Sequence, residues 1–149
     1  MSLITLPAGA GTEYPFLGTT MTVKASASQT DGGLTLIEQV CPPGFATPRH
    51  LHHHDDEAFY VLDGAIRVHH GEDTWEAGPG AFVLLPRRRP HAFAVVSSEP
   101  ARLLQLTWPA GFEQFAERVA AMPPGPPDPA ALTAVAAEFG YEITGPPPH

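Results

Sequence analysis

Three histidines and one glutamate in this chain are spaced as converging metal ligands would be. His50 and His52 are two residues apart, and Glu57 opens the apolar run that follows them. Because successive side chains of a β-strand point to opposite faces, two histidines at this spacing point into one shared space. Imidazole and carboxylate groups together suit one divalent transition metal ion, such as iron, nickel, manganese, zinc or copper. His91 is the candidate for a further inward-facing ligand.

The elements that must position these residues are short strands. Segments rich in Val, Thr, Ile and Phe recur along the chain, and turn signals separate them at intervals of about eight to twelve residues. The pair Asp63-Gly64, between two apolar runs, predicts a hairpin. This pattern indicates an all-β sandwich or barrel. We expect one ligand strand near residues 47–53 and a second over the run EAFYVL.

The spacing of these residues resembles the first sequence motif of the cupin superfamily. That motif contains a glycine, two histidines, a glutamate and a second glycine, and the matching residues here are Gly44, His50, His52, Glu57 and Gly64. The resemblance implies that the two histidines and the glutamate bind a metal ion. It extends over roughly residues 11–110, and the segment LTWPAGFEQF is similar to the small single-domain cupins described as quercetin-dioxygenase-like.

The second cupin motif is only partly present. Its first glycine, its proline and its histidine are matched by Gly80, Pro86 and His91. Arg88 stands where the motif has a second glycine, and Val95 stands where it has an asparagine. The residue that matters for a metal, the histidine, is retained. The resemblance therefore implies a ligand set of three histidines and one glutamate.

The resemblance also implies the fold class and the domain organisation. We expect an all-β cupin barrel, a double-stranded β-helix or jelly roll, over residues 13–109. Residues 1–12 are expected to form a flexible arm, and residues 110–149 a helical extension with a proline-rich linker. Two short amphipathic helices are predicted in that extension, and we expect them to pack on the outer face of the barrel or on a partner subunit.

Side chains that share the alternation of the ligands are expected to line a cavity beside the metal. Most of them are apolar or aromatic, which favours an apolar or aromatic substrate with a polar group for the metal. The alternative is that they fill the barrel core. One of Glu38 and Gln39 must also face inward, and the sequence does not decide which. The predicted substrate-binding residues are Phe59, Val61, Phe93, Val95 and Gln105.

Other charged residues near the motifs are interpreted as surface groups. His54 has the alternation of the ligands, so a ligand role is its alternative. For Asp56 the alternative is a hydrogen bond to a ligand imidazole. Arg87, Arg88 and Arg89 either steer an anionic substrate or form salt bridges in a solvated loop. The residues expected at the rim, in the solvated turn or on the surface are His53, His54, Asp55, Asp56, His69 and His70.

Composition narrows the class of protein further. The formal net charge of −8 argues against nucleic acid as a partner, because phosphate binding needs basic surface. No apolar run reaches the length of a membrane span. A single cysteine excludes an internal disulfide and fits a cytoplasmic location. A chain of 149 residues has the size of one domain.

The resemblance implies three classes of function. The first is a metal-dependent dioxygenase that acts on an enolisable aromatic compound, flavonol-like or polyketide-like, with Glu57 as ligand and catalytic base. The second is a non-redox cyclase, isomerase or lyase in which the metal polarises a carbonyl group. The third is a small-molecule-binding cupin without turnover. Cupins commonly pair through an outer sheet face, so we also expect a homodimer.

Overall fold

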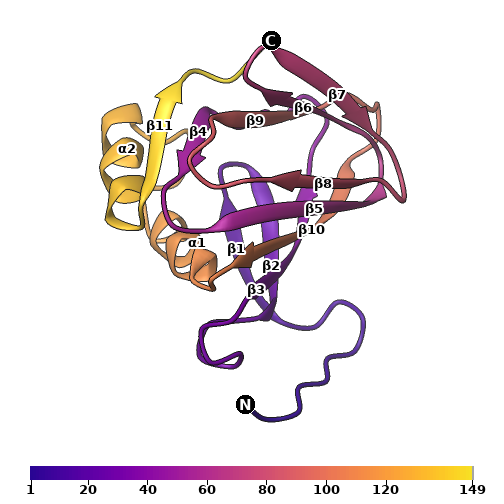
Figure 1. Ribbon diagram of the computed structural model, residues 1–149, viewed down its shortest axis with the longest axis vertical. Coiled ribbons are helices and arrows are strands. Elements are labelled where there is room, and N and C mark those ends of the chain that lie inside the picture. Colours follow the sequence, from indigo (N-terminus) through magenta and orange to yellow (C-terminus); the bar gives the residue numbers. More distant parts are fainter. Residues whose placement is uncertain (149) are drawn as a thin grey trace.

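Two antiparallel sheets face each other in the computed structural model, which describes residues 1–148 (Figure 1). The first sheet has the order β1 (Thr12–Phe16), β2 (Thr19–Ala25), β3 (Thr35–Cys41), β10 (Ala101–Trp108), β5 (Asp56–Asp63) and β8 (Phe82–Leu85). The second has the order β11 (Tyr141–Gly145), β4 (Arg49–His52), β9 (His91–Val95), β6 (Ile66–His70) and β7 (Asp73–Ala77). The prediction of an all-β jelly roll is confirmed. His149, the end of the expected extension, lies outside the described residues, and the boundaries at residues 12 and 109 stay predictions.

Alternation along the strands separates the core from the outer surface. In β3 the side chain of Gln39 is buried and donates to the hydroxyl of Thr19 at 3.0 Å. Its neighbour Glu38 points outward and accepts a hydrogen bond from Arg102 at 3.2 Å. Of Glu38 and Gln39, between which the sequence does not decide, Gln39 is therefore the residue that faces inward. Strand β10 pairs with both β3 and β5, so it lies at the centre of its sheet.

The two predicted helices are present, as α1 (Phe112–Ala120) and α2 (Pro129–Glu138). Helix α2 begins where expected, because the side chain of Asp128 accepts the backbone N–H of Ala131 at 3.0 Å and caps the first turn. No helix in the described part of the chain is long and apolar enough to cross a membrane.

The position of the helices differs from the expectation. They lie at one end of the two sheets rather than on the outer face of the barrel (Figure 1). Four apolar residues of α1 recur at helical spacing and pack against inward-facing side chains of β1, β2 and β3, because the open end of the sandwich offers uncovered apolar surface. The residues of this shared core are Phe16, Met21, Val23, Ile37, Phe112, Phe115, Ala116, Val119, Leu132, Val135, Ala136 and Tyr141.

A polar contact fastens α1 to the first sheet. The Glu113 carboxylate accepts the backbone N–H of Ala27 and the hydroxyl of Thr35, each at 2.6 Å. At the other end of the extension, β11 adds an edge strand to the second sheet beside β4. The histidine-bearing strand β4 is thus enclosed between β9 and β11, and both of its neighbours contribute to the site.

The two glycines of the first cupin motif, Gly44 and Gly64, differ in how strictly the fold requires glycine at their positions. Gly44 and Gly64 both have positive φ angles, 81° and 72°. A Cβ atom at Gly64 would lie 2.7 Å from the Pro100 carbonyl oxygen and 2.8 Å from the Cα atom of Ala101, whereas nothing lies within 4 Å of a Cβ at Gly44. Of these two glycines, only Gly64 has both a left-handed backbone conformation and backbone atoms so close that a Cβ atom would clash with them.

We expect Gly64→Ala to lower the free energy of unfolding more than Gly44→Ala, as measured by denaturant unfolding. Left-handed backbone costs alanine about 1–2 kcal/mol at either position. Overpacking at Gly64 adds on the order of 1–3 kcal/mol. Equal losses in the two variants would show that the close approach to Pro100 and Ala101 is without energetic consequence.

Candidate metal centre

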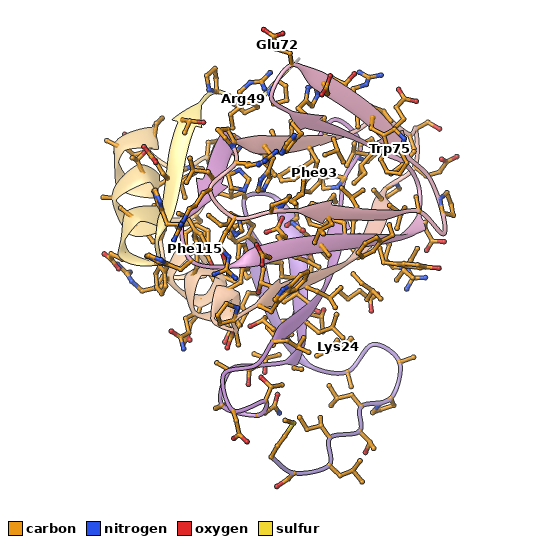
Figure 2. The ribbon with its side chains drawn as sticks, viewed as in Figure 1. Lys24, Arg49, Glu72, Trp75, Phe93 and Phe115 are labelled. Atoms are coloured by element: carbon orange, nitrogen blue, oxygen red, sulfur yellow. The ribbon has the colours of Figure 1, made fainter. Side chains whose placement is uncertain are left out.

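The second sheet brings three histidines together. His50 and His52 project from β4, and His50 stands directly opposite His91 on β9, so the two share one face of the sheet. One nitrogen from each ring lies within 4.8 Å of the other two. His52 and His91 are 1% and 2% exposed. The space between the sheets, into which Phe93 also points in Figure 2, therefore holds a compact cluster of imidazoles.

Hydrogen bonds determine which nitrogen of each imidazole carries the proton. Each ring has an oxygen acceptor beside its Nδ1 atom, so Nδ1 carries the proton and the Nε2 lone pair remains for a metal. The Nε2 atoms of His52 and His91 are buried without a hydrogen-bond partner among the described residues. This donor set fits a divalent transition ion. The Nδ1 contacts are His50 to the Pro48 carbonyl at 2.8 Å, His52 to Asp55 at 2.7 Å and His91 to the Arg89 carbonyl at 3.2 Å.

The electrostatics of the cluster favour the neutral form of two of its three histidines. Burial, with the neighbouring histidines, lowers the pKa of His50 to about 4 and the pKa of His91 to about 2. Both rings are therefore neutral at neutral pH, as metal ligation requires. Burial also opposes the charged form of His52, but the carboxylates of Glu57 and Asp55 outweigh it and raise the pKa of that ring.

The structure places Glu57 against two of the three histidines. Its Oε2 atom lies 3.2 Å from Nε2 of His52, and its Oε1 atom lies 3.8 Å from Nε2 of His91. The side-chain amide of Gln105 donates to Oε2 at 3.2 Å. Glu57 is almost completely buried, and this burial raises the pKa of its carboxyl group. A buried carboxylate of raised pKa beside a histidine cluster is suited to accept a proton.

The acidic turn after the histidines differs from the prediction. Asp55 is buried rather than solvated, and its two oxygens contact Nδ1 of His52 at 2.7 Å and the hydroxyl of Tyr141 at 2.9 Å. Asp56, the alternative partner for a ligand imidazole, instead pairs with Arg87 at 3.0 Å. No local sequence pattern indicates this burial, because Tyr141, which contacts Asp55, comes from β11, far along the chain. Arg87 therefore forms a salt bridge with Asp56, which is one of the two roles that the sequence allowed for it.

A mostly apolar pocket opens onto the histidines. The space inside it that a water-sized sphere can reach is about 60 Å³, and the pocket is partly open to solvent. Three of the predicted substrate-binding residues line it, namely Phe59, Phe93 and Gln105. Val61 and Val95 instead pack in the barrel core beneath it, which was the alternative reading of the alternation.

Much of the pocket wall comes from segments that the sequence did not connect with the site. Phe16 and Met21 reach it from the first two strands and Leu17 from the turn between them, and the C-terminal extension supplies a further set. The apolar stripe of α1 was recognisable, but its target surface was not. The lining residues from the extension are Phe112, Phe115, Leu132, Ala136, Tyr141 and Ile143.

The other histidines divide into two groups. His53 and His54 are exposed, as expected. His69 is buried, and His70 is half-buried directly opposite His91, with an Nε2 atom that has no partner among the described residues. The surface prediction is therefore wrong for both. His70 has the alternation of the buried Ile66 and Val68, and that signal would have placed it inward.

Comparison with known proteins identifies the class. The model of the cupin domain family matches residues 37–107. An uncharacterized protein of Methanocaldococcus jannaschii is 25% identical over 75 residues, which are 50% of this chain and 60% of that protein. The chain thus matches less than two thirds of the length of this curated relative.

Two solved structures show the same fold. The polyketide cyclase RemF from Streptomyces resistomycificus superposes with a TM-score of 0.62 at 23% identity, covering 71% of this chain and 79% of that one. The cupin domain of Cnp3 from Schizosaccharomyces pombe superposes with a TM-score of 0.56 at 16% identity, covering 67% and 70%. Residues 37–107 of the chain are thus a cupin domain, and the structure has the fold that these two proteins share. The quercetin-dioxygenase-like subgroup stays a prediction.

We expect His52→Ala to lose bound metal and to lower the melting temperature, because metal binding to the native state stabilises it. At a metal concentration 100 times Kd this linkage is worth about 2.7 kcal/mol. His53→Ala is the matched control, since that exposed ring pairs only with Glu142 in the described structure. Elemental analysis and thermal unfolding measure both effects. Equal metal content in the two variants would contradict a ligand role for His52.

Proposed function

We propose that this protein is a metal-dependent dioxygenase that acts on an enolisable aromatic small molecule. The observation that carries the proposal is the buried carboxylate of Glu57, which lies between the histidine cluster and an aromatic-lined pocket. His50, His52 and His91 would hold one divalent ion, with Glu57 as the fourth ligand. When bound, such an ion supplies a Lewis acid and, if it is redox-active, a path for electrons to O2.

The residues of the chain account for proton transfer and orientation. Glu57 would take the proton of a phenol or enol hydroxyl, since its buried carboxylate lines the pocket beside the histidines. Gln105 holds that carboxylate in place through its amide N–H. The aromatic rings of Phe59, Phe93 and Phe112 flank the pocket and exclude water from the deprotonated substrate.

We expect protein loaded with Fe(II), Ni(II) or Mn(II) to consume O2 when it is given a flavonol or an enolisable polyketide-like compound. Glu57→Gln should lower kcat by about 10²- to 10⁴-fold, because the base is lost while the volume is kept. Glu38→Gln, on the outer face, is the control. An oxygen electrode measures the rates. No uptake with these metals across a broad aromatic panel would contradict the proposed reaction.

A second candidate is a non-redox cyclase, isomerase or lyase of the aromatic polyketide type. The same buried base favours it, since proton transfer at Glu57 in a dry pocket needs no O2. Full turnover by the Zn(II)-loaded protein under anaerobic conditions would select this class. A ligand that binds tightly and is recovered unchanged by mass spectrometry would instead indicate a cupin without turnover.

We further propose that the protein forms a homodimer through the outer face of β5 and β8. Tyr60 and Phe82 are exposed directly opposite each other there, and Leu84 is exposed two residues further along the edge strand β8. Contiguous exposed apolar side chains of this kind mark association surfaces.

We expect Phe82→Glu to convert dimers into monomers in light scattering after size-exclusion chromatography, because it buries a charge at the proposed interface. Trp75→Glu is the control, since that residue is similarly exposed but lies on β7 of the other sheet. Monomers in the unaltered protein, or an unchanged mass for Phe82→Glu, would contradict this interface.

A further inference from the structure

A buried chain of hydrogen bonds links the C-terminal strand to the histidine cluster. The hydroxyl of Tyr141 donates to Oδ2 of Asp55 at 2.9 Å, and Oδ1 of Asp55 lies 2.7 Å from Nδ1 of His52. All three residues are buried, so water does not compete for these contacts. Hydrogen bonds to a carboxylate in such surroundings are stronger and more directional than those at a surface.

The backbone places these groups in register. Strand β11 pairs with β4, and Tyr141 stands directly opposite His52. The ring of Tyr141 packs against the imidazole of His52, with centroids 4.5 Å apart. The ring of Phe112 from α1 lies nearly parallel to the same imidazole, at 6.2 Å and 14°. His52 is thus surrounded by side chains of the C-terminal extension.

His52 differs from the other two histidines in its Nδ1 partner. His50 and His91 lie beside backbone carbonyl groups, whereas His52 lies beside a carboxylate. A carboxylate partner fixes the ring orientation and also raises the basicity of the opposite nitrogen, Nε2. The carboxylate in turn needs a second donor to hold its own orientation, and Tyr141 supplies it.

We propose that Asp55 and Tyr141 are positioning residues that orient His52 for a metal ion, so that the C-terminal strand is a functional part of the metal centre. The inference rests on the metal site proposed above and on no particular reaction. It follows that docking of the strand and metal binding favour each other, since coupling between two equilibria is reciprocal.

The test is the metal affinity of the folded protein, measured with Zn(II) in competition with a chromophoric chelator. Asp55→Asn should weaken binding by about 10- to 100-fold. Tyr141→Phe keeps the ring but removes one hydrogen bond, and should weaken binding on the order of threefold to tenfold. The double variant should bind no more weakly than Asp55→Asn alone, because the hydroxyl acts only through Asp55. Tyr14→Phe, at a half-buried tyrosine of β1 outside this hydrogen-bond chain, is the control.

A merely structural role gives a different pattern. In that case Tyr141→Phe lowers the melting temperature of the metal-free protein but leaves the Zn(II) affinity unchanged, and this outcome overturns the proposal. The absorption spectrum of bound Co(II) gives a second readout, since it should change in Tyr141→Phe when the ligand ring is reoriented. An unaltered spectrum together with an unaltered affinity also overturns it.

Hydrogen exchange tests the reciprocal effect in the unaltered chain. Zn(II) should raise the protection of backbone amides in β11 more than in the hairpin of β1 and β2, which lies outside this hydrogen-bond chain. Equal protection in both segments overturns the coupling. Failure of the unaltered protein to bind any divalent ion rejects the metal site itself, whereas normal binding with insensitive variants rejects only the positioning role.

Discussion

The central physical constraint of this structure is the burial of polar ligand groups between two apolar sheets. An imidazole or a carboxylate removed from water costs several kcal/mol unless another group satisfies it. His50, His52 and His91 meet this cost on one ring nitrogen through protein oxygens and leave the other nitrogen facing a shared centre. The local architecture follows from this requirement, because each acceptor must be held where its histidine needs it.

The C-terminal extension both covers apolar side chains of the sandwich and places Tyr141 beside His52. The sandwich formed by the strands alone would leave apolar side chains such as Met21 and Ile37 uncovered at one end. Helices α1 and α2 bury that surface, and removing this apolar area from water stabilises the folded protein. The same extension ends in β11, which brings Tyr141 to the ligand His52. Packing and positioning of the site are therefore consequences of one tertiary arrangement.

The fold by itself leaves the chemistry undecided, since one architecture supports many unrelated reactions. The side chains of the site, rather than the fold, determine which chemistry is possible. A buried carboxylate, that of Glu57, lies beside the imidazoles of His52 and His91 in a pocket that aromatic rings also line. For the substrate proposed above, such a site would separate the deprotonated aromatic ring from water, and this separation would serve both oxygenation and non-redox proton transfer. The metal and the fate of the substrate then distinguish the two.

Local patterns in the sequence determined most of the strands, both helices and the side of β4 that carries its two histidines. These features follow from alternation, capping and apolar periodicity, which act over a few residues. Alternation along β6 also indicates that His70 faces inward, because His70 lies on the same side of the strand as Ile66 and Val68.

Tertiary structure decided the remainder. Local rules do not say which distant surface an apolar helix covers, so α1 was expected on the outer face and instead closes the pocket. Nor do they show that a turn residue such as Asp55 becomes buried, because its partner Tyr141 is distant along the chain. Val61 and Val95 share the alternation of the ligands, yet depth within the barrel places them in the core. Sequence spacing fixes the direction of a side chain, whereas burial depends on segments that only folding brings together.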